Sequence, residues 1–417
     1  MNGIPEPPGK TWFWELEAAV IEADRCIQCG TCVAACPSNS IGVSEDTGLP
    51  ELIKMCTGCS LCWDFCPRGG LRYEALWPPS SVIEDADPNA EDDRELVVRK
   101  DAADSYFTLS GGPPEAGLGL VAASYAVRSS QRNDEAQDGG AVTSILSALM
   151  SAGEIDGAIV AAPSPDPDEP WRGIATVVTT PAELAQTAGS FYNQTMALAS
   201  LDLAGATLPA NPRLALVGTA CEVQGLRAMQ ARRWSTGAHR IDSVVLTIAL
   251  LCTKSFDYEA LMLREIREAR GVDLDRVSKV DVTRGRLLVE YRDGQMAVDE
   301  PIKNFHAAAL KGCDECADFL GRAADLSVGS VGSLPGWTSL LVRSERGERA
   351  FDVARRALDV RGIDDPAALA KLDALDKRIA VGSLQRALDP DAPLFIDYAE
   401  HLSSYADSDR QPVVIRR

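Results

Sequence analysis

The chain has 417 residues, of which 46% are apolar, and a formal net charge of −20. This length predicts two or three domains with a sizeable core. The acidic balance excludes a nucleic-acid backbone as partner, because its phosphates would be repelled. The longest apolar run, Val244–Cys252, is too short for a transmembrane segment, which takes roughly 20 residues. With no signal-peptide pattern at the N-terminus, we expect a cytoplasmic protein, at most peripheral to a membrane complex through its partners, with reduced cysteines.

Residues 1–25 form an N-terminal extension whose second half, Thr11–Arg25, is predicted to be a short helix. Three aromatic side chains open this helix: Trp12, Phe13 and Trp14. They predict packing against the next domain, and the alternative is a docking surface for a partner subunit.

The next segment, residues 26–78, contains two copies of the pattern C-x2-C-x2-C-x3-C-P, at Cys26–Pro37 and Cys56–Pro67. This pattern is typical of bacterial ferredoxins with two [4Fe–4S] clusters, in which the fourth cysteine of each run crosses to the other cluster. Zinc sites use four ligands in two pairs, so they do not explain two quartets that each end in Cys-Pro. The predicted ligands are Cys26, Cys29, Cys32 and Cys66 for cluster 1, and Cys56, Cys59, Cys62 and Cys36 for cluster 2.

An acidic, proline-bearing stretch, residues 79–110, is predicted to be a linker. Residues 111–345 then alternate between predicted strands and helices, which indicates an α/β domain. The predicted strands are Gly157–Ala162, Ala175–Thr180, Leu214–Gly218, Val244–Leu251 and Leu287–Gly294, and the main helices are Ala141–Gly153 and Ser255–Gly271. Residues 346–417 are predicted to be a helical C-terminal region. The fold class is therefore α+β or α/β: a ferredoxin-like module, an α/β domain and a helical tail.

Four cysteines remain outside the ferredoxin-like segment, namely Cys221, Cys252, Cys313 and Cys316. Cys221 and Cys252 follow predicted strands, and such strand ends gather at one edge of an α/β sheet. Cys313 and Cys316 form a C-x-x-C pair. Spacing alone leaves three interpretations open: a third cluster, a zinc site, or unrelated buried thiols.

The chain resembles the family of coenzyme F420 hydrogenase/dehydrogenase beta subunits over roughly residues 111–345. The segments that carry the resemblance, in the family's order, are QDGGAVTSIL (137–146), VGTACEVQGLR (217–227), LCTKSF (251–256) and KGCDECADFLGRAADLSVGSVGSLPGW (311–337). With the eight-cysteine segment in front, the chain is similar to the electron-input subunit of F420H2 dehydrogenases. The resemblance implies FAD, a third [4Fe–4S] cluster held by the four remaining cysteines, and coenzyme F420 as substrate. Two features depart from the family: Ala220 stands where proline is common, and the tail is longer than a minimal core.

The resemblance also makes flavin binding an expectation for several turns at strand ends. Glycines allow close approach of a pyrophosphate, and a helix N-terminus presents free N–H groups to it. Taken alone, each of these turns is equally explained as an ordinary loop. The candidate flavin contacts are Gly139, Gly140, Thr143, Tyr192, Asn193, Gln194, Gly218, Thr219, Gly329 and Trp337.

A basic group near the flavin would stabilise its anionic reduced form. Lys254 and Lys311 are the candidates for this catalytic role because each lies close in sequence to a cysteine of the third set. The alternative is that both lysines are solvated. Because deazaflavin coenzymes have an acidic tail, we also expect a local basic patch.

Flavin chemistry would then carry the reaction, since FAD exchanges hydride as a pair and passes electrons singly. The first hypothesis is an oxidoreductase subunit that exchanges hydride between F420 and FAD and relays electrons through three clusters to or from a partner complex. That partner would be a hydrogenase, a formate dehydrogenase or an F420H2 dehydrogenase. The alternative is a ferredoxin-dependent reductase that acts on another organic substrate, and the third is an electron-relay protein without flavin.

Overall fold

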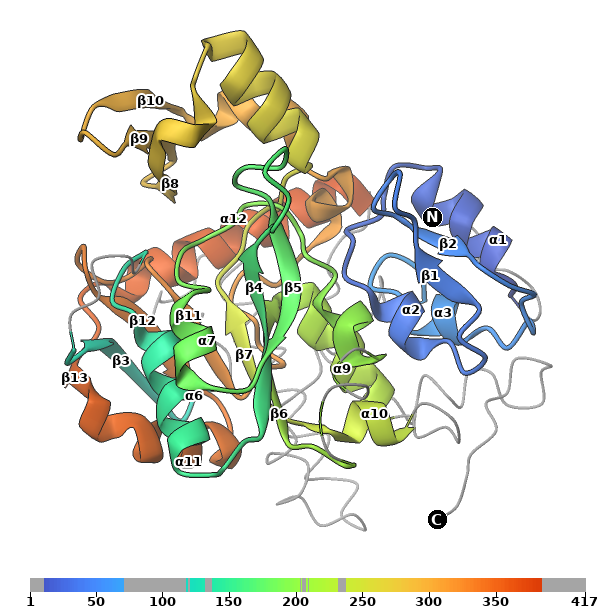
Figure 1. The fold of residues 1–417 in the computed structure, drawn as a ribbon, viewed down its shortest axis with the longest axis horizontal. Helices are drawn as coiled ribbons and strands as arrows, with labels where there is room; N and C mark the ends of the chain where they lie inside the picture. Colours follow the sequence, from blue (N-terminus) through green and yellow to red (C-terminus); the bar gives the residue numbers. More distant parts are fainter. Residues whose placement is uncertain are drawn as a thin grey trace.

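The computed structural model describes residues 11–70, 118, 121–131 and 137–384, except for 203, 205–207, 209 and 232–237. The predicted linker, residues 79–110, and the end of the tail lie outside the described residues. The rest forms an N-terminal cysteine block, a mixed eight-stranded sheet with helices on both faces, and a separate three-stranded sheet (Figure 1). The predicted mixed α/β class is therefore confirmed.

The cysteine block, residues 11–70, is built from short elements. They are α1 (Phe13–Leu16), the π-helix η1 (Glu17–Ile21), α2 (Thr31–Ala35), β1 (Ile41–Val43), β2 (Pro50–Leu52) and α3 (Leu61–Asp64). The first helix is shorter than predicted because Asp24 adopts a left-handed conformation with φ of 58°. Of its aromatic residues, Phe13 is buried in the block, whereas Trp14 is 48% exposed and stacks on Trp12.

The main sheet has the strand order β13-β3-β12-β11-β7-β6-β4-β5. The bounds are β3 (Ala123–Ser129), β4 (Gly157–Pro163), β5 (Gly173–Val178), β6 (Leu214–Thr219), β7 (Val244–Leu250), β11 (Leu326–Gly329), β12 (Thr338–Val342) and β13 (Leu358–Arg361). Strands β4, β6, β7 and β11 are parallel neighbours. Strand β12 is antiparallel to both β11 and β3, so β3 points the same way as the parallel group. The carboxyl ends of these five strands therefore share one edge, where ligand sites form in such sheets.

Each face of the main sheet has its own hydrophobic cluster. On one face, α6 (Ala141–Ser151) and α11 (Glu345–Ala354) bury Ile145, Leu146 and Phe351 against the strands. On the other face, α9 (Ala220–Ala231), α10 (Ala238–Asp242) and the 3-10 helix η3 (Ala197–Ser200) join α2 and α3 of the cysteine block. Phe65 and Leu226 belong to this shared cluster. The block is thus fixed to the α/β domain by a common core, beside α9 and α10 (Figure 1).

The chain between β7 and β11 forms a small separate layer. It contains the π-helix η4 (Glu259–Glu268), η5 (Leu274–Arg276), β8 (Val277–Thr283), β9 (Arg286–Tyr291), β10 (Met296–Pro301), η6 (Ile302–Ala308) and η7 (Lys311–Glu315). Strands β8 to β10 are antiparallel, so the predicted strand Leu287–Gly294 lies outside the main sheet. The insert contacts the carboxyl edge of that sheet, because Tyr192 Oη accepts a 2.8 Å hydrogen bond from Val282 N.

The C-terminal region contains a strand in addition to the predicted helices. After α11 and the single turn η8 (Arg355–Ala357), residues Leu358–Arg361 form β13, which pairs antiparallel with β3. This strand covers the otherwise open backbone edge of β3 and buries Leu358 in the core. The last described element is α12 (Pro366–Leu384), which packs on η7. None of the helices in the described ranges is long and apolar enough to cross a membrane.

Candidate cofactor sites

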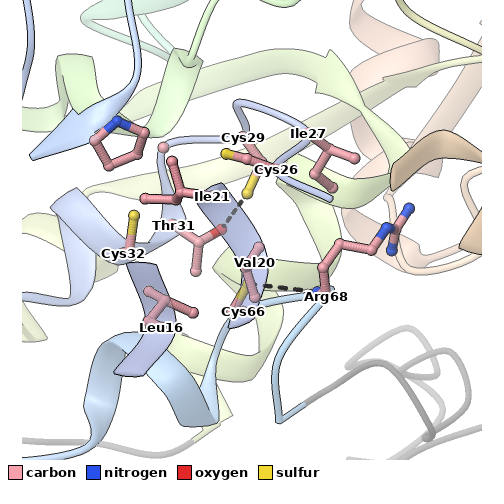
Figure 2. A pocket seen from close by; sticks show the side chains of 12 residues that line it. Leu16, Val20, Ile21, Cys26, Ile27, Cys29, Thr31, Cys32, Cys66 and Arg68 are labelled. Atoms are coloured by element: carbon pink, nitrogen blue, oxygen red, sulfur yellow. Dashed lines mark hydrogen bonds between the residues drawn. The ribbon is translucent and has the colours of Figure 1, made fainter. Parts of the chain in front are cut away.

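The first pocket of the cysteine block gathers the four cysteines predicted for cluster 1. Together with its opening to solvent, the pocket has an empty volume of about 360 Å³. Figure 2 shows Cys26, Cys29 and Cys32 from the first run and Cys66 from the second around this space, with Leu16, Val20, Ile21, Ile27, Thr31 and Arg68. Cys66 has therefore crossed to the first run, as the two-cluster pattern requires.

The second pocket gathers the complementary set. Its empty volume is about 260 Å³. The cysteines that line it are Cys36, Cys56, Cys59 and Cys62. Cys59 is exposed, while Cys36 and Cys62 are buried. This pocket is therefore the more accessible of the two from outside the protein.

Left-handed backbone positions produce the tight loops that turn the cysteines inward. Gly30, with φ of 76°, precedes α2, and Gly58, with φ of 65°, lies between Cys56 and Cys59. A Cβ on Gly30 would lie 2.7 Å from Ala199 N, so this glycine also allows the block to approach η3. Backbone N–H groups donate to the sulfurs, as in the 3.1 Å contact from Ser40 N to Cys36 Sγ. A thiolate-bound cluster is stabilised by such donors.

The thiols of each pocket influence one another's pKa, and they do so within the two expected groups. Burial raises the pKa of Cys26 and of Cys66 to about 12, and the charge of Cys29 contributes to both shifts. Burial also raises the pKa of Cys62, and charges on Cys59, Cys56 and Cys36 raise it further. Metal coordination would have to displace these protons. In the described residues, no three His, Cys, Asp or Glu side chains are grouped as a site for a single metal ion.

The other four cysteines come from three separate parts of the α/β domain. Cys221 lies in the first turn of α9, Cys252 lies two residues beyond β7, and Cys313 and Cys316 flank the end of η7. Burial raises the pKa of Cys252, and charges on Cys313 and Cys316 raise it further. Burial likewise raises the pKa of Cys221, with contributions from Cys29 and Cys316. Ser255 contacts Cys252 Sγ at 3.9 Å through its Oγ and Cys313 Sγ at 3.5 Å through its backbone N, so the thiols form a third group. That group borders the first pocket, because Arg68, which lines the pocket, donates to Gly312 O directly before Cys313.

A chain of polar side chains connects the third cysteine group to the carboxyl edge of the sheet. Gln194 is 7% exposed. It donates to Thr219 Oγ1 at 2.9 Å and accepts from Ser255 Oγ at 2.8 Å. Thr219 Oγ1 in turn lies 3.0 Å from Cys221 Sγ, and Ser255 N donates to Cys313 Sγ at 3.5 Å. Gln194 and Thr219 therefore contact the surroundings of the third group, whereas the sequence had suggested a flavin role for them.

The glycine positions expected at the flavin lie at the same carboxyl edge. Gly140, with φ of 66°, is the N-cap residue of α6, and Thr143 lies in that helix. A Cβ on Gly139 would lie 2.6 Å from Val127 O, and one on Gly218 would lie 2.5 Å from Glu222 Oε2. Gly329 ends β11, and a Cβ there would lie 2.7 Å from Leu251 Cβ. Backbone therefore leaves no room for a Cβ at Gly139, while the side chains of Glu222 and Leu251 fill the space beside the other two glycines.

Tyr192 and Asn193 have protein partners in this structure. Tyr192 Oη contacts Asp281 Oδ1 at 3.3 Å. Asn193 Oδ1 accepts from Gly173 N, and its Nδ2 donates to Gly173 O, both at 2.8 Å. These contacts connect the segment to β5 and to the three-stranded sheet. Asn193 in particular is satisfied by backbone atoms, which is a structural role.

Trp337 lies between two arginines at the start of β12. The guanidinium carbons of Arg128 and Arg361 lie 4.6 and 4.2 Å from its ring centroid. Arg128 pairs with Asp359 at 2.9 Å, and Arg361 pairs with Asp364 at 2.8 Å. Among the described residues, these two arginines are most like the expected basic patch. Both, however, are ion-paired with carboxylates.

The two candidate lysines lie in different environments. Lys254 is 16% exposed and pairs with Asp314, beside the third cysteine group. Lys311 is 73% exposed and pairs with Asp24 of the cysteine block. Lys254 therefore lies near the third group, as its candidate role requires. Lys311 lies at the surface, in agreement with the alternative that it is solvated.

Arg68, Ser255 and Glu222 are site residues that the sequence did not reveal. Ser255 directly follows Lys254 within the family-like segment 251–256, so that motif was a usable signal. Glu222 is 2% exposed and accepts from Thr219 N at 2.8 Å and Ala197 N at 2.9 Å, which fixes the turn before Cys221. Nothing in the sequence distinguishes Arg68 from a surface arginine.

Three family models match the chain in succession. Residues 19–72 match the 4Fe-4S dicluster domain, residues 124–202 the N-terminal part of the coenzyme F420 hydrogenase/dehydrogenase beta subunit, and residues 212–366 its C-terminal part. The chain belongs to the family of coenzyme F420 hydrogenase/dehydrogenase beta subunits. It is an oxidoreductase of that family with an N-terminal dicluster domain, as the sequence predicted.

The chain is similar to several named members of this family. The chain is 28% identical to one of the subunits of the F(420)H(2) dehydrogenase of Methanosarcina mazei, over 84% of this chain and 87% of the relative. It is 29% identical to the coenzyme F420-dependent sulfite reductase of Methanocaldococcus jannaschii, over 80% of this chain but only 46% of that protein, so it spans about half of the latter's length. It is 31% identical to the beta subunit of the coenzyme F420 hydrogenase of Methanothermobacter thermautotrophicus, over 58% and 83% of the two chains.

A solved structure extends the similarity to the fold. A chain of the F420-reducing [NiFe] hydrogenase complex from Methanosarcina barkeri superposes with a TM-score of 0.60 at 26% identity. The match covers 64% of this chain and 92% of that one.

Proposed function

We propose that this chain exchanges hydride between coenzyme F420 and FAD and relays single electrons through three [4Fe–4S] clusters to or from a partner complex. The observation that carries the proposal is the third cysteine group, which lies at the carboxyl edge of the sheet and also borders the first pocket. Its relatives are named as F420-dependent enzymes or as subunits of F420 hydrogenases and dehydrogenases, which supports F420 as the substrate.

The cysteines fit clusters better than isolated thiols. In the first pocket, four sulfurs from two distant runs surround one space, and backbone N–H groups donate to Cys26 and Cys66. We assign cluster 1 to Cys26, Cys29, Cys32 and Cys66, cluster 2 to Cys56, Cys59, Cys62 and Cys36, and cluster 3 to Cys221, Cys252, Cys313 and Cys316.

The order of the three sites follows from their neighbours. Arg68 lines the first pocket and donates to Gly312 O, directly before Cys313 of the third group. Cys32 of the first pocket and Cys62 of the second belong to one buried cluster. Cys59 of the second pocket is exposed. Electrons would therefore pass between cluster 3 and cluster 1, then cluster 2, and leave or enter at the exposed side of the block.

FAD would supply the exchange of a hydride for two single electrons, and the chain would orient it at the carboxyl edge. The left-handed Gly140 opens α6, whose first N–H groups lack intrahelical partners and suit a pyrophosphate. Of the two lysines considered, Lys254 lies beside the third group and would be the one to stabilise a negative charge on a reduced flavin ring. A redox partner such as a hydrogenase, formate dehydrogenase or F420H2 dehydrogenase subunit would dock at the second pocket.

Anaerobic purification followed by mixing with F420H2 tests this function. We expect bound FAD, about twelve irons per chain, and bleaching of flavin and cluster absorbance by F420H2. A protein that binds flavin and clusters but reacts only with reduced ferredoxin would instead be the ferredoxin-dependent reductase. A protein without flavin would be an electron relay, and the proposal would be rejected.

A further inference from the structure

Arg68 is a buried cation at the boundary between the cysteine block and the α/β domain. Its side chain is 4% exposed, and Figure 2 shows it extending away from the first pocket. Nε donates to Gly312 O at 2.5 Å, and Nη1 donates to Pro67 O at 2.9 Å. Among the described residues it forms no direct ion pair with a carboxylate, but the charge of Glu315 acts on it. Backbone carbonyls, Glu315 and the sulfurs of the two cysteine groups therefore share in compensating its charge.

Both cysteine groups lie within the reach of this charge. On one side, Arg68 lines the first pocket, and its backbone N donates to Cys66 Sγ at 3.4 Å. On the other side, Gly312 directly precedes Cys313, so the hydrogen bond to its carbonyl places the guanidinium beside the third group. The thiols of Cys221, Cys313 and Cys316 all interact electrostatically with Arg68. The second pocket contains no atom of Arg68.

We propose that Arg68 is a shared counter-charge for clusters 1 and 3 and raises the reduction potential of both. Its hydrogen bonds also fix the position of the two sites relative to each other. This inference rests on the proposed assignment of those clusters. A cluster bound by four thiolates is an anion, and it gains a further negative charge on reduction. A fixed cation in a buried site stabilises the reduced form more than the oxidised form, because low polarity leaves the attraction weakly screened.

The position of Arg68 between the two sites would also favour electron transfer between them. Arg68 would stay protonated and close to both sites while an electron passed from one to the other. Its charge would stabilise the electron at either site, so the transfer would need neither a proton nor a movement of the counter-charge. Arginine suits this position because its guanidinium stays charged and its planar fork can donate to two carbonyls at once.

Redox titration of the holoprotein, followed by electron paramagnetic resonance with mediators and no F420, tests the proposal. In Arg68→Gln, the ratio of reduced to oxidised cluster at a fixed potential should fall about tenfold for clusters 1 and 3, a shift of about 59 mV for a one-electron couple. Cluster 2 should not move, which gives an internal control. Arg68→Lys keeps the charge and should recover most of the shift. Lys54→Gln removes an exposed charge beside Cys56 and should leave both inner potentials unchanged.

A second variant covers the case in which Arg68→Gln fails to assemble its clusters. Arg68→Met removes the same charge with a flexible apolar side chain, and it should lower both inner potentials as Arg68→Gln does. Unchanged inner potentials in Arg68→Gln or in Arg68→Met would overturn the role of Arg68. Because no F420 is used, this result is independent of whether F420H2 reduces the protein.

Discussion

Replacing Gly312 with alanine should separate the first and third cysteine groups without removing a ligand. A Cβ on Gly312 would lie 2.1 Å from Arg25 O and 2.8 Å from Ile27 Cγ2. Real Cβ atoms stay beyond about 3.0 Å, so η7 and the loop before Cys26 must move apart by about 0.9 Å. The nearest atom belongs to the backbone, and a flexible side chain therefore cannot absorb the clash. Overpacking of this kind costs about 1–3 kcal/mol.

The displacement acts where the two domains are joined by polar contacts. Arg25 pairs with Glu315 at 2.5 Å, and Gly312 O accepts from Arg68. We therefore expect Gly312→Ala to retain its irons but to show a lower apparent Tm. Electron transfer from cluster 3 to cluster 1 should also be slower, as measured by freeze-quench electron paramagnetic resonance after reduction with F420H2.

Gly362 provides the matched control for this substitution. No atom outside its immediate neighbours lies within 4 Å of a Cβ built there, so Gly362→Ala should leave both the apparent Tm and the transfer rate unchanged. If Gly312→Ala matches wild type in both measurements, the close contact between η7 and the cysteine block does not control the coupling of the two groups.

Three further changes test the surroundings of the third group. Arg322→Met leaves the buried Asp373 without its 2.7 Å ion-pair partner and should lower stability by about 3–5 kcal/mol, seen as earlier thermal unfolding. Burial raises the pKa of Asp376 to about 8, so the native state binds a proton that the unfolded chain releases near pH 4, and stability should fall as pH rises from about 4 to about 8. Asp376→Asn should therefore flatten the dependence of apparent Tm on pH, and an unaltered profile would exclude Asp376 as its source. Gln194→Leu removes the donor to Thr219 beside Cys221 and should alter the paramagnetic signal of cluster 3 alone, while signals from the other clusters act as the reference.

Local patterns predicted how the cysteines of the block are grouped, because short-range spacing decides that grouping. The crossing of Cys36 and Cys66 follows from the repeated run, and the two pockets gather the predicted sets. Strands such as Leu214–Thr219 were found because their apolar residues are continuous. β13 was missed because four residues between helical segments gain their strand conformation only from pairing with β3.

The flavin contacts show what sequence order could not decide. Gln194 and Asn193 are adjacent, and both carry an amide. Yet Asn193 bonds the backbone of Gly173, whereas Gln194 joins Thr219 to Ser255 at the third group. Arg68 has a role that its sequence context did not suggest. It is buried because the block packs on η7, some 240 residues later in the chain. Long-range packing decides the roles of all three residues.

The helix α12 shows how the longer tail contributes to the surroundings of the third cysteine group. The family match ends at residue 366, and α12 begins at Pro366 and packs on η7. It supplies Asp373, which pairs with the buried Arg322 six residues beyond Cys316. It also supplies Asp376, whose charge affects both Cys252 and Cys316. Since η7 is a short 3-10 turn with few internal hydrogen bonds of its own, its position depends on what packs against it. The cysteine block supports η7 from one side through Arg25 and Arg68, and α12 supports it from another, so the third cysteine group is held by segments from both ends of the chain.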